Sequence, residues 1–301
     1  MDQAEALREM TREADMLRRG GPAPDGGRGA VRCAASSVRV VAVTSGKGGV
    51  GKTNISANLA YFLTRKKRKT LILDADLGLA NIDVILGLTP RYNLHHVLSG
   101  ERRLSEAMIQ GPGGIRILPS SSGIQEMSEL SQGQKLLLLD ELDSLEQELD
   151  FMLIDTGAGI SGNVMYFNMA AGEIIVVTSP EPTAMTDAYA LIKILYQRHA
   201  KKRFLLLVNM VRSAAEGREV FQRLSHAVGY FLNLQISPLG HIVQDEHITE
   251  AVKRQQIFAE RYPESPAAVC LRAVADRLCR EKPPEGDTGG LRFLSRKTRE
   301  Q

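Results

Sequence analysis

Cysteine, net charge and long apolar runs are all scarce in this chain of 301 residues. The three cysteines, Cys33, Cys270 and Cys279, show no C-x-x-C spacing, which disfavours both a disulfide framework and a zinc site. The start of the chain lacks the apolar core of a signal peptide, and no apolar stretch approaches the roughly 20 residues that span a bilayer. We therefore expect a cytoplasmic protein without a membrane-spanning helix.

The small net charge gives little support to nucleic-acid binding. It is +3, whereas a basic DNA-binding domain concentrates its cations in a stripe. One unbroken basic run, residues 65–69, falls between an expected helix and the next expected strand. A solvated turn with cations near a helix C-terminus is the favoured interpretation, and we expect no specific nucleic-acid partner.

A glycine-rich loop is the most informative feature that is present. It has the pattern G-x-x-x-x-G-K-T from Gly46 to Thr53, after an apolar strand expected over residues 38–43 and before a helix expected over 54–63. Backbone N–H groups of such a loop surround a polyphosphate, and Lys52 adds a positive charge at the β- and γ-phosphates. The Thr53 hydroxyl is placed to coordinate Mg²⁺. The predicted nucleotide-binding residues of the loop are Gly48, Gly49, Val50, Gly51, Lys52, Thr53 and Asn54.

Further apolar runs alternate with longer amphipathic stretches along the chain. The runs occupy residues 70–73, 151–154, 174–177 and 204–208. Continuous apolar strands separated by helices predict an α/β fold with a mostly parallel, twisted sheet covered by helices on both faces. Ligands bind beyond the carboxyl ends of such strands. The polar residues expected on that side are Asp74, Asp155, Thr178 and Asn209.

Lys47 gives the loop one lysine more than phosphate binding requires. The pattern K-G-G-x-G-K-T resembles the deviant Walker A motif of the MinD/ParA family of P-loop ATPases. The resemblance implies ATP hydrolysis and a homodimer in the ATP state, in which Lys47 reaches the phosphates of the partner's nucleotide. It also implies that Asp76 lies near the γ-phosphate and the metal, where it orients the attacking water, and that Asp155 holds Mg²⁺ through water.

Other residues fit the same resemblance. Gly157 would let the backbone approach the γ-phosphate. Asn209 and Arg212 match positions where the family reads adenine, although an asparagine that caps a strand end is the alternative. Val243 stands where relatives often place a proline, so the expected adenine contact from that segment is in doubt.

The stretch 154–195 and the first residues look similar to the FlhG subgroup, also called FleN or YlxH, which regulates flagellar number and placement. The N-terminal heptad resembles the D-Q-A-x-x-L-R motif that stimulates the GTPase FlhF in that subgroup. The residues implied in this contact are Asp2, Gln3, Ala4, Leu7 and Arg8. A flagellar switch protein or a flagellar transcription regulator would be a further partner.

These features predict one ATPase domain with an extension at each end. We expect an activator helix over residues 1–19, a flexible linker over 20–37, the ATPase domain over 38–280 and a second linker over 281–290. The basic amphipathic tail, 291–301, resembles the membrane-targeting helices of MinD-like proteins. It would bind anionic lipid and place the ATP-bound protein at the inner face of the cell membrane.

Other members of the fold family offer rival functions. A partition ATPase of the ParA type would bind DNA nonspecifically in the presence of ATP. An iron–sulfur carrier needs bridging cysteines, and none lies between Cys33 and Cys270. A tyrosine kinase of this family would carry a tyrosine cluster at its C-terminus, yet no tyrosine lies beyond Tyr262.

Overall fold

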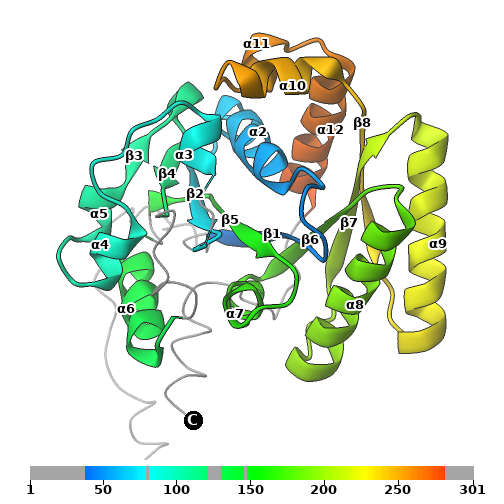
Figure 1. The fold of residues 1–301 in the computed structure, drawn as a ribbon, viewed down its shortest axis with the longest axis horizontal. Coiled ribbons are helices and arrows are strands. Elements are labelled where there is room, and N and C mark those ends of the chain that lie inside the picture. Colours follow the sequence, from blue (N-terminus) through cyan, green and yellow to red (C-terminus); the bar gives the residue numbers. More distant parts are fainter. Residues whose placement is uncertain (1–37, 79–80, 121–129, 146–147, 282–301) are drawn as a thin grey trace, which may run out of the picture. The chain divides into compact units, whose positions relative to one another are not determined.

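The computed structural model describes residues 38–78, 81–120, 130–145 and 148–281. These residues form an eight-stranded sheet with helices on both faces (Figure 1). The predicted activator helix, the first linker and the basic tail lie outside the described residues, as does nearly all of the second linker. No helix in the part that the structure describes is both long and apolar enough to cross a membrane.

The strand order in the sheet is β3-β4-β2-β5-β1-β6-β7-β8. All neighbouring strands run parallel except β3 and β4, which confirms the mostly parallel sheet. The strands are β1 (Arg39–Ser45), β2 (Thr70–Ala75), β3 (Ile109–Gln110), β4 (Arg116–Leu118), β5 (Phe151–Ala158), β6 (Glu173–Thr178), β7 (Phe204–Val211) and β8 (Ser237–Val243).

Helices connect the strands, and serine side chains begin four of the longer ones. In α6, α7, α9 and α12 the capping hydroxyl accepts a hydrogen bond from the N–H three residues ahead. The α-helices are α2 (Lys52–Arg65), α3 (Ile82–Ile85), α4 (Leu94–Leu98), α5 (Leu104–Ala107), α6 (Gln132–Asp143), α7 (Gly162–Ala170), α8 (Pro182–His199), α9 (Ala214–Leu232), α10 (Glu246–Lys253), α11 (Phe258–Arg261) and α12 (Pro266–Arg280).

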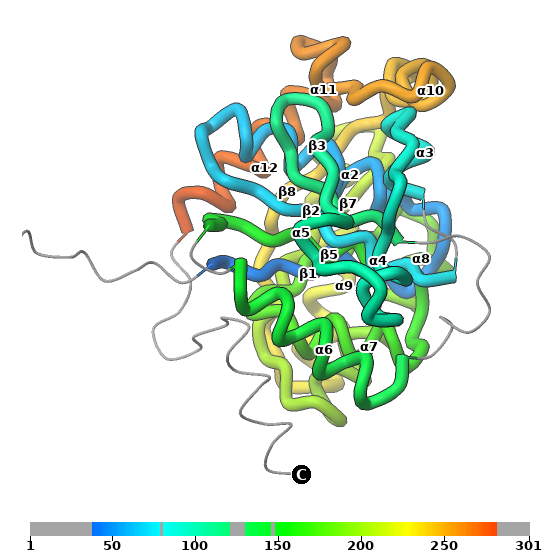
Figure 2. Tube along the Cα trace, turned by 90° about the vertical axis from the view of Figure 1, so that its left-hand side faces the viewer, coloured from blue at the N-terminus to red at the C-terminus, as the bar shows by residue number. Residues whose placement is uncertain are grey.

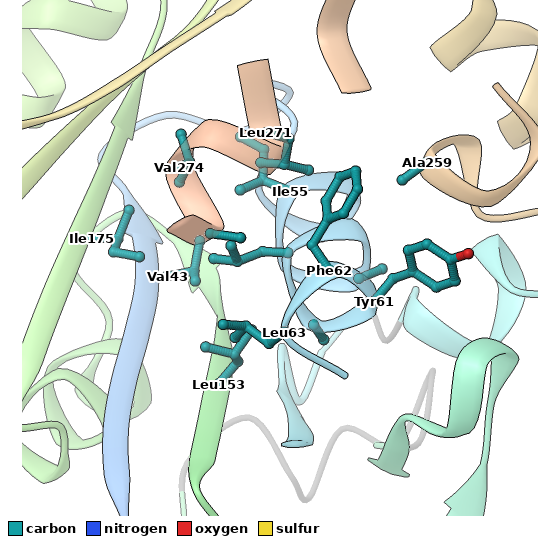
Figure 3. Packing of buried hydrophobic residues seen from close by; sticks show 14 of the residues in the cluster. Val43, Ile55, Tyr61, Phe62, Leu63, Leu153, Ile175, Ala259, Leu271 and Val274 are labelled. Carbon is teal, nitrogen blue, oxygen red and sulfur yellow. The ribbon is translucent and has the colours of Figure 1, made fainter. Parts of the chain in front are cut away.

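Alternate residues of the central strands pack into different layers. Val43 of β1 and Ile175 of β6 belong to the hydrophobic core that α2 and α12 cover, together with Leu63 and Leu271 (Figure 3). Ala42, one residue earlier in β1, belongs instead to the core on the α6 and α7 side. The sheet is therefore buried on both faces, as its continuous apolar strands predict.

The helices divide between the two faces of the sheet. Seen from the side, α6 and α7 lie on one side of β1, β2 and β5, while α10, α11 and α12 lie on the other (Figure 2). On the α6 and α7 side, α8 and α9 cover β6 and β7 with a third hydrophobic core. Because each helix returns the chain to the amino edge of the sheet, all the parallel strands end at the same edge, where the glycine loop lies.

Candidate nucleotide-binding site

The glycine loop joins β1 to α2 by a tight turn. Gly49 and Gly51 have φ angles of 79° and 88°, in the left-handed region that favours glycine. A Cβ atom on Gly51 would lie 2.6 Å from Nδ2 of Asn209, so this position also excludes side chains by space. Gly51 is the N-cap residue of α2, and no side-chain cap hydrogen bond forms there among the described residues. Backbone N–H groups of the first turn are therefore left for an anion.

A cavity of about 790 Å³ opens at this loop. Predicted residues from three separate segments meet around it, which the order of parallel strands requires. They are Gly48, Gly49, Gly51, Lys52, Thr53 and Asn54 from the loop and α2, Asp76 after β2, and Gly157 in β5. Val50 is only 3% exposed and packs into the core instead.

Lys52 is buried with an exposed fraction of 8%. Burial lowers the pKa of its ammonium group, while the charges of Asp155 and Asp76 act in the opposite direction. Burial penalises the charged form because little water solvates it. An anionic phosphate in the cavity would therefore favour the charged lysine more strongly than it would at an exposed site.

Asp155 lies below the loop and is 1% exposed. Ser56 Oγ of α2 donates a hydrogen bond of 2.8 Å to Asp155 Oδ1, and the Thr53 hydroxyl is a second partner. Burial raises the pKa of Asp155 to about 6 despite these bonds. The expected strand end at this aspartate is wrong, because β5 continues to Ala158.

The two aspartates after β2 have different surroundings. Asp76 lines the cavity, and its Oδ1 would lie 3.2 Å from a Cβ atom at position 157. Gly157 therefore allows the close approach of β5 to this carboxylate. Asp74 is 1% exposed and accepts hydrogen bonds from the backbone N–H groups of Asp76, Asn81 and Ile82. Its place is under the segment after β2, not in the cavity lining.

Thr53, Asp76 and Asp155 remain the candidates for holding Mg²⁺. Within the described residues, no group of three or more His, Cys, Asp or Glu side chains could hold a metal ion without other ligands. In nucleotide sites, Mg²⁺ is commonly held by one or two protein groups together with phosphate oxygens and water. The buried carboxylate of Asp155, beside the Thr53 hydroxyl, supplies hard oxygen donors of the kind that Mg²⁺ requires.

A second cavity of about 300 Å³ adjoins the first. Gly51, Asn54 and Met210 line both cavities, and Asn209 Nδ2 donates a hydrogen bond of 2.8 Å to Val50 O. Its size and mixed lining suit a nucleotide base. The rest of the lining includes Ile55, Ile242, Val243, Gln244, Asp245, Ile248, Phe258 and Leu271.

Two residues that the sequence analysis considered for the base site lie in different places. Val243, where the family resemblance predicts a proline in many members, lines the second cavity. Arg212 is not among the residues that line either cavity. Its side chain is 83% exposed and forms an ion pair of 3.2 Å with Glu216 in α9. The structure thus brings Asn209 to the candidate base site but leaves Arg212 on the surface.

Lys47 also points away from the cavity lining. Its Nζ forms an ion pair of 2.5 Å with Glu181 Oε2 and donates a hydrogen bond of 2.9 Å to Thr183 Oγ1. Both partners stand at the start of α8, and the lysine side chain is 38% exposed. In the single chain the lysines of the loop are therefore separated, with Lys52 in the cavity and Lys47 on α8.

These features define a P-loop nucleotide-binding protein. A glycine loop with left-handed φ angles joins a buried strand to a helix, and it carries a buried lysine beside an aspartate of the adjacent strand. The AAA domain family matches residues 38–206, more than half of the chain. The chain is 44% identical to the antiactivator FleN of Pseudomonas aeruginosa over 257 residues, which cover 85% of this chain and 92% of FleN.

Two other relatives extend the comparison. The chain is 38% identical to the flagellum site-determining protein YlxH of Helicobacter pylori, with 80% of this chain and 82% of YlxH covered. The septum site-determining protein MinD of Pyrococcus horikoshii, complexed with Mg-ADP, superposes with a TM-score of 0.68 at 28% identity, covering 81% of this chain and 96% of MinD.

The chain belongs to the MinD/ParA family of ATPases and, within it, to the FlhG subgroup. ATPases of this family use ATP with Mg²⁺. The buried Lys52, the Thr53 hydroxyl and Asp155 fit that pair of ligands.

Proposed function

We propose that this chain is an ATP-dependent dimerising switch that regulates flagellar number or placement. Its similarity to FleN and YlxH supports the flagellar role, since it extends over at least 80% of the chain in both comparisons. The observation that carries the switch is the separation of the two loop lysines. Lys52 belongs to the nucleotide cavity of its own chain, while Lys47 is held on the surface by α8.

The proposed roles follow from burial and position. The loop N–H groups and Lys52 bind the phosphates, and Thr53 with Asp155 and Asp76 holds the metal. Asp76 lines the cavity beside Gly157 and orients the attacking water, which is mainly a positioning task in phosphoryl transfer. Asn209 and the second cavity receive the base.

Dimerisation would move Lys47 from Glu181 to the phosphates of the partner's nucleotide. The ion pair of Lys47 with Glu181 is solvent-exposed, with exposed fractions of 38% and 64%, and such pairs contribute about 0–1 kcal/mol. The phosphates of a partner's nucleotide carry more negative charge than the single carboxylate of Glu181. Exchange of Glu181 for a partner's phosphates would therefore couple ATP binding to dimer formation.

The two terminal segments would connect this switch to its partners. Residues 1–19 would stimulate the GTPase FlhF through the D-Q-A-x-x-L-R heptad, and the tail 291–301 would bring the ATP-bound dimer to anionic lipid at the inner face of the membrane. A flagellar switch protein or transcription regulator would be a further partner. The similarity to the flagellum site-determining protein YlxH supports partners in flagellar assembly.

Cells that lack their own copy of the gene provide the test. Wild-type protein should restore the normal number of flagella per cell, counted by electron microscopy, and Lys52→Ala should fail. Asp76→Ala should form the ATP dimer in light scattering, hydrolyse ATP very slowly, and disturb flagellar number. Restoration by Lys52→Ala at equal protein level would contradict a nucleotide switch, and a normal count without the gene would contradict the flagellar role.

A further inference from the structure

Two aromatic side chains at the end of α9 are unusually exposed. Tyr230 is 76% exposed and Phe231 is 68% exposed, more than any other large apolar side chain of the described residues. Exposed apolar surface of this kind on a soluble protein often marks an interaction site. Both residues lie inside the helix, which continues to Leu232.

The two rings belong to a continuous aromatic surface across α8 and α9. The ring centroids of Tyr230 and Phe231 lie 4.9 Å apart, and Phe231 contacts Tyr189 of α8 edge-on at 6.3 Å. His226 stacks on Tyr230 at 6.4 Å with an interplanar angle of 18°. We call Tyr189, His226, Tyr230 and Phe231 the aromatic face.

The aromatic face stands on a well-packed base. Tyr189 is half-buried against the core that α8 and α9 share with β6 and β7. On α9, Leu224, Val228 and Leu232 are buried at intervals of four residues, so His226 and Tyr230 lie on the opposite side of the helix. Phe231 lies beside the buried stripe, where it contacts Tyr189 of α8. Phe231, which contacts both Tyr189 and Tyr230, loses less conformational freedom on binding than an isolated exposed side chain would.

The helix segments that carry the aromatic face have basic and no acidic residues. Residues 188–199 and 220–232 contain no aspartate or glutamate, but they contain Lys193, Arg198 and Arg223 besides histidines. Lys193 is exposed one turn after Tyr189 and makes no ion pair with any described residue. The acidic groups at the margin are Asp187 and Glu219, and Glu219 already pairs with Arg223 at 2.5 Å.

The location separates this surface from the nucleotide. Helix α9 starts just after the carboxyl end of β7 and runs back along the sheet beside α8 (Figure 1). Tyr230 and Phe231, in its last turn, therefore lie toward the amino edge of the sheet, away from the glycine loop. A partner at this surface would leave the nucleotide cavities accessible.

We propose that the aromatic face is a docking site for a short amphipathic helix of another protein, with apolar anchors flanked by aspartate and glutamate. Two neighbouring helices with aromatic side chains between them suit a helix laid in a groove. The surrounding cations select an acidic partner and disfavour a basic one. This inference goes beyond the proposed function, because it concerns neither the nucleotide site nor the terminal segments.

A displayed library of random short peptides, selected on the full-length protein and counter-selected on Phe231→Ala, tests the chemical class. We expect acidic sequences with apolar residues at helical spacing. Enrichment of basic or uncharged sequences, or of none that discriminates against Phe231→Ala, would overturn the proposal.

Affinity is then measured with a selected peptide that carries one tryptophan. The chain contains no tryptophan, so the fluorescence reports the peptide alone. Phe231→Ala should weaken binding by about tenfold or more, as for an anchor at an interface centre. Lys193→Glu should weaken binding by about threefold or more. Added salt should then lower the affinity less than it does for the wild type, or should raise it.

Matched variants on other elements serve as controls. Val269 is 48% exposed on α12, so its replacement by alanine removes an apolar group away from the aromatic face. Arg91 is exposed between α3 and α4, so its replacement by glutamate reverses a charge there. Val269→Ala and Arg91→Glu should leave the affinity within about twofold of the wild type. ATP affinity should be unchanged in all four variants, which shows that each is folded.

Three other binding partners of the aromatic face would give different experimental results. Self-association of the nucleotide-free protein that Phe231→Ala abolishes would assign the face to a second copy. Low-salt retention on duplex DNA that both Phe231→Ala and Lys193→Glu abolish would assign it to nucleic acid. Markedly tighter peptide binding by a chain lacking residues 1–37 would assign it to that segment. Each of these results would overturn the proposal.

Discussion

Asp155 destabilises the nucleotide-free protein because its carboxylate is buried before any metal arrives. Its pKa is raised from 3.8 to about 6, so between these pH values the folded state binds more protons than the unfolded state. Stability therefore falls as pH rises through this window, and the full cost is present at pH 7. A shift of this size corresponds to about 3 kcal/mol at most.

The variant Asp155→Asn removes this charge and keeps an oxygen that can accept the Ser56 hydrogen bond. Without nucleotide and with a chelator present, we expect its free energy of unfolding at pH 7 to exceed that of the wild type by about 1–3 kcal/mol. Urea unfolding at several pH values measures the difference, which should vanish below pH 4. ATP hydrolysis should be lost. An equal or lower stability at pH 7 would show that the charged carboxylate is well solvated.

The two lysines of the loop should fail in different ways when replaced. Lys52→Ala removes a buried charge at the phosphates, so nucleotide binding should be lost. Lys47→Ala breaks only an exposed ion pair, so ATP binding and stability should change little, while dimerisation and hydrolysis fall. A cation supplied in trans can change the rate by roughly 10³ to 10⁵.

Fluorescent nucleotide titration and light scattering distinguish these outcomes. Glu181→Gln is the matched control, since it releases Lys47 without removing its charge, and it should dimerise at least as well as the wild type. A fully active ATP dimer of Lys47→Ala would refute the proposed role in trans.

At the scale of single elements, the segment between β2 and α3 depends on Asp74. This carboxylate accepts backbone N–H groups at 3.1, 3.2 and 3.3 Å from Asp76, Asn81 and Ile82. Burial raises its pKa well above the usual range, with a further contribution from the charge of Asp155. The N–H of Ile82 is buried and the other two are part-buried, and such groups need an acceptor more than they need a charge.

Asp74→Ala should therefore lower the free energy of unfolding by about 1–3 kcal/mol and speed amide hydrogen exchange at Asn81 and Ile82. Asp74→Asn keeps one acceptor oxygen and should lose less. Asp83→Ala is the control, because Asp83 Oδ1 accepts the N–H of the next residue, Val84, and supports no longer-range contact of this kind within the described residues. Unchanged exchange in Asp74→Ala would exclude this supporting role.

The helix predicted over residues 1–19 should act independently of the ATPase domain. A peptide of these residues should stimulate GTP hydrolysis by FlhF, because the heptad carries the expected contacts. Gln3→Ala and Leu7→Asp should reduce the stimulation while the ATPase activity of the full chain stays the same. The release of phosphate from GTP measures it, and unchanged FlhF turnover would refute the assignment.

The central elements could be predicted because each strand is a continuous apolar run. The expected strand over residues 70–73 lies within β2, and the helix over 54–63 lies within α2. The predicted strands were too short, since β5 continues beyond its apolar run through Asp155, Thr156 and Gly157. The edge strand β8 could not be predicted, because Pro238 and Gly240 interrupt its apolar pattern.

At the scale of the whole molecule, the loop residues that line the first cavity were predictable, whereas most of the second cavity, apart from Asn209, was not. The phosphate loop is one continuous motif, whereas the second cavity takes Gln244, Asp245 and Phe258 from segments that only the folded chain brings beside Asn209. Ser56 was likewise absent from the prediction, although it lies on α2 one turn after Thr53 and contacts Asp155. Helical spacing from the metal-binding threonine is the signal that could have identified it.

We expect membrane attachment to depend on the dimer more than on a single tail. Leu291, Phe293 and Leu294 would each contribute roughly 1.5–3 kcal/mol if fully buried. The four cations of this tail would add about 1 kcal/mol each near anionic headgroups. Ordering the segment costs about 1–2 kcal/mol per residue, so one tail should bind only marginally.

Two tails in an ATP dimer should bind together, because attachment of the first raises the effective concentration of the second. We therefore expect co-sedimentation with anionic liposomes in the presence of ATP and much less with ADP. Deletion of residues 291–301 should abolish it. Lys52→Ala, which we expect not to bind ATP, should bind as weakly as the ADP form. Neutral liposomes are the control for charge. Equal sedimentation with ADP and ATP, or sedimentation that survives the deletion, would show that the tail does not couple nucleotide state to the membrane.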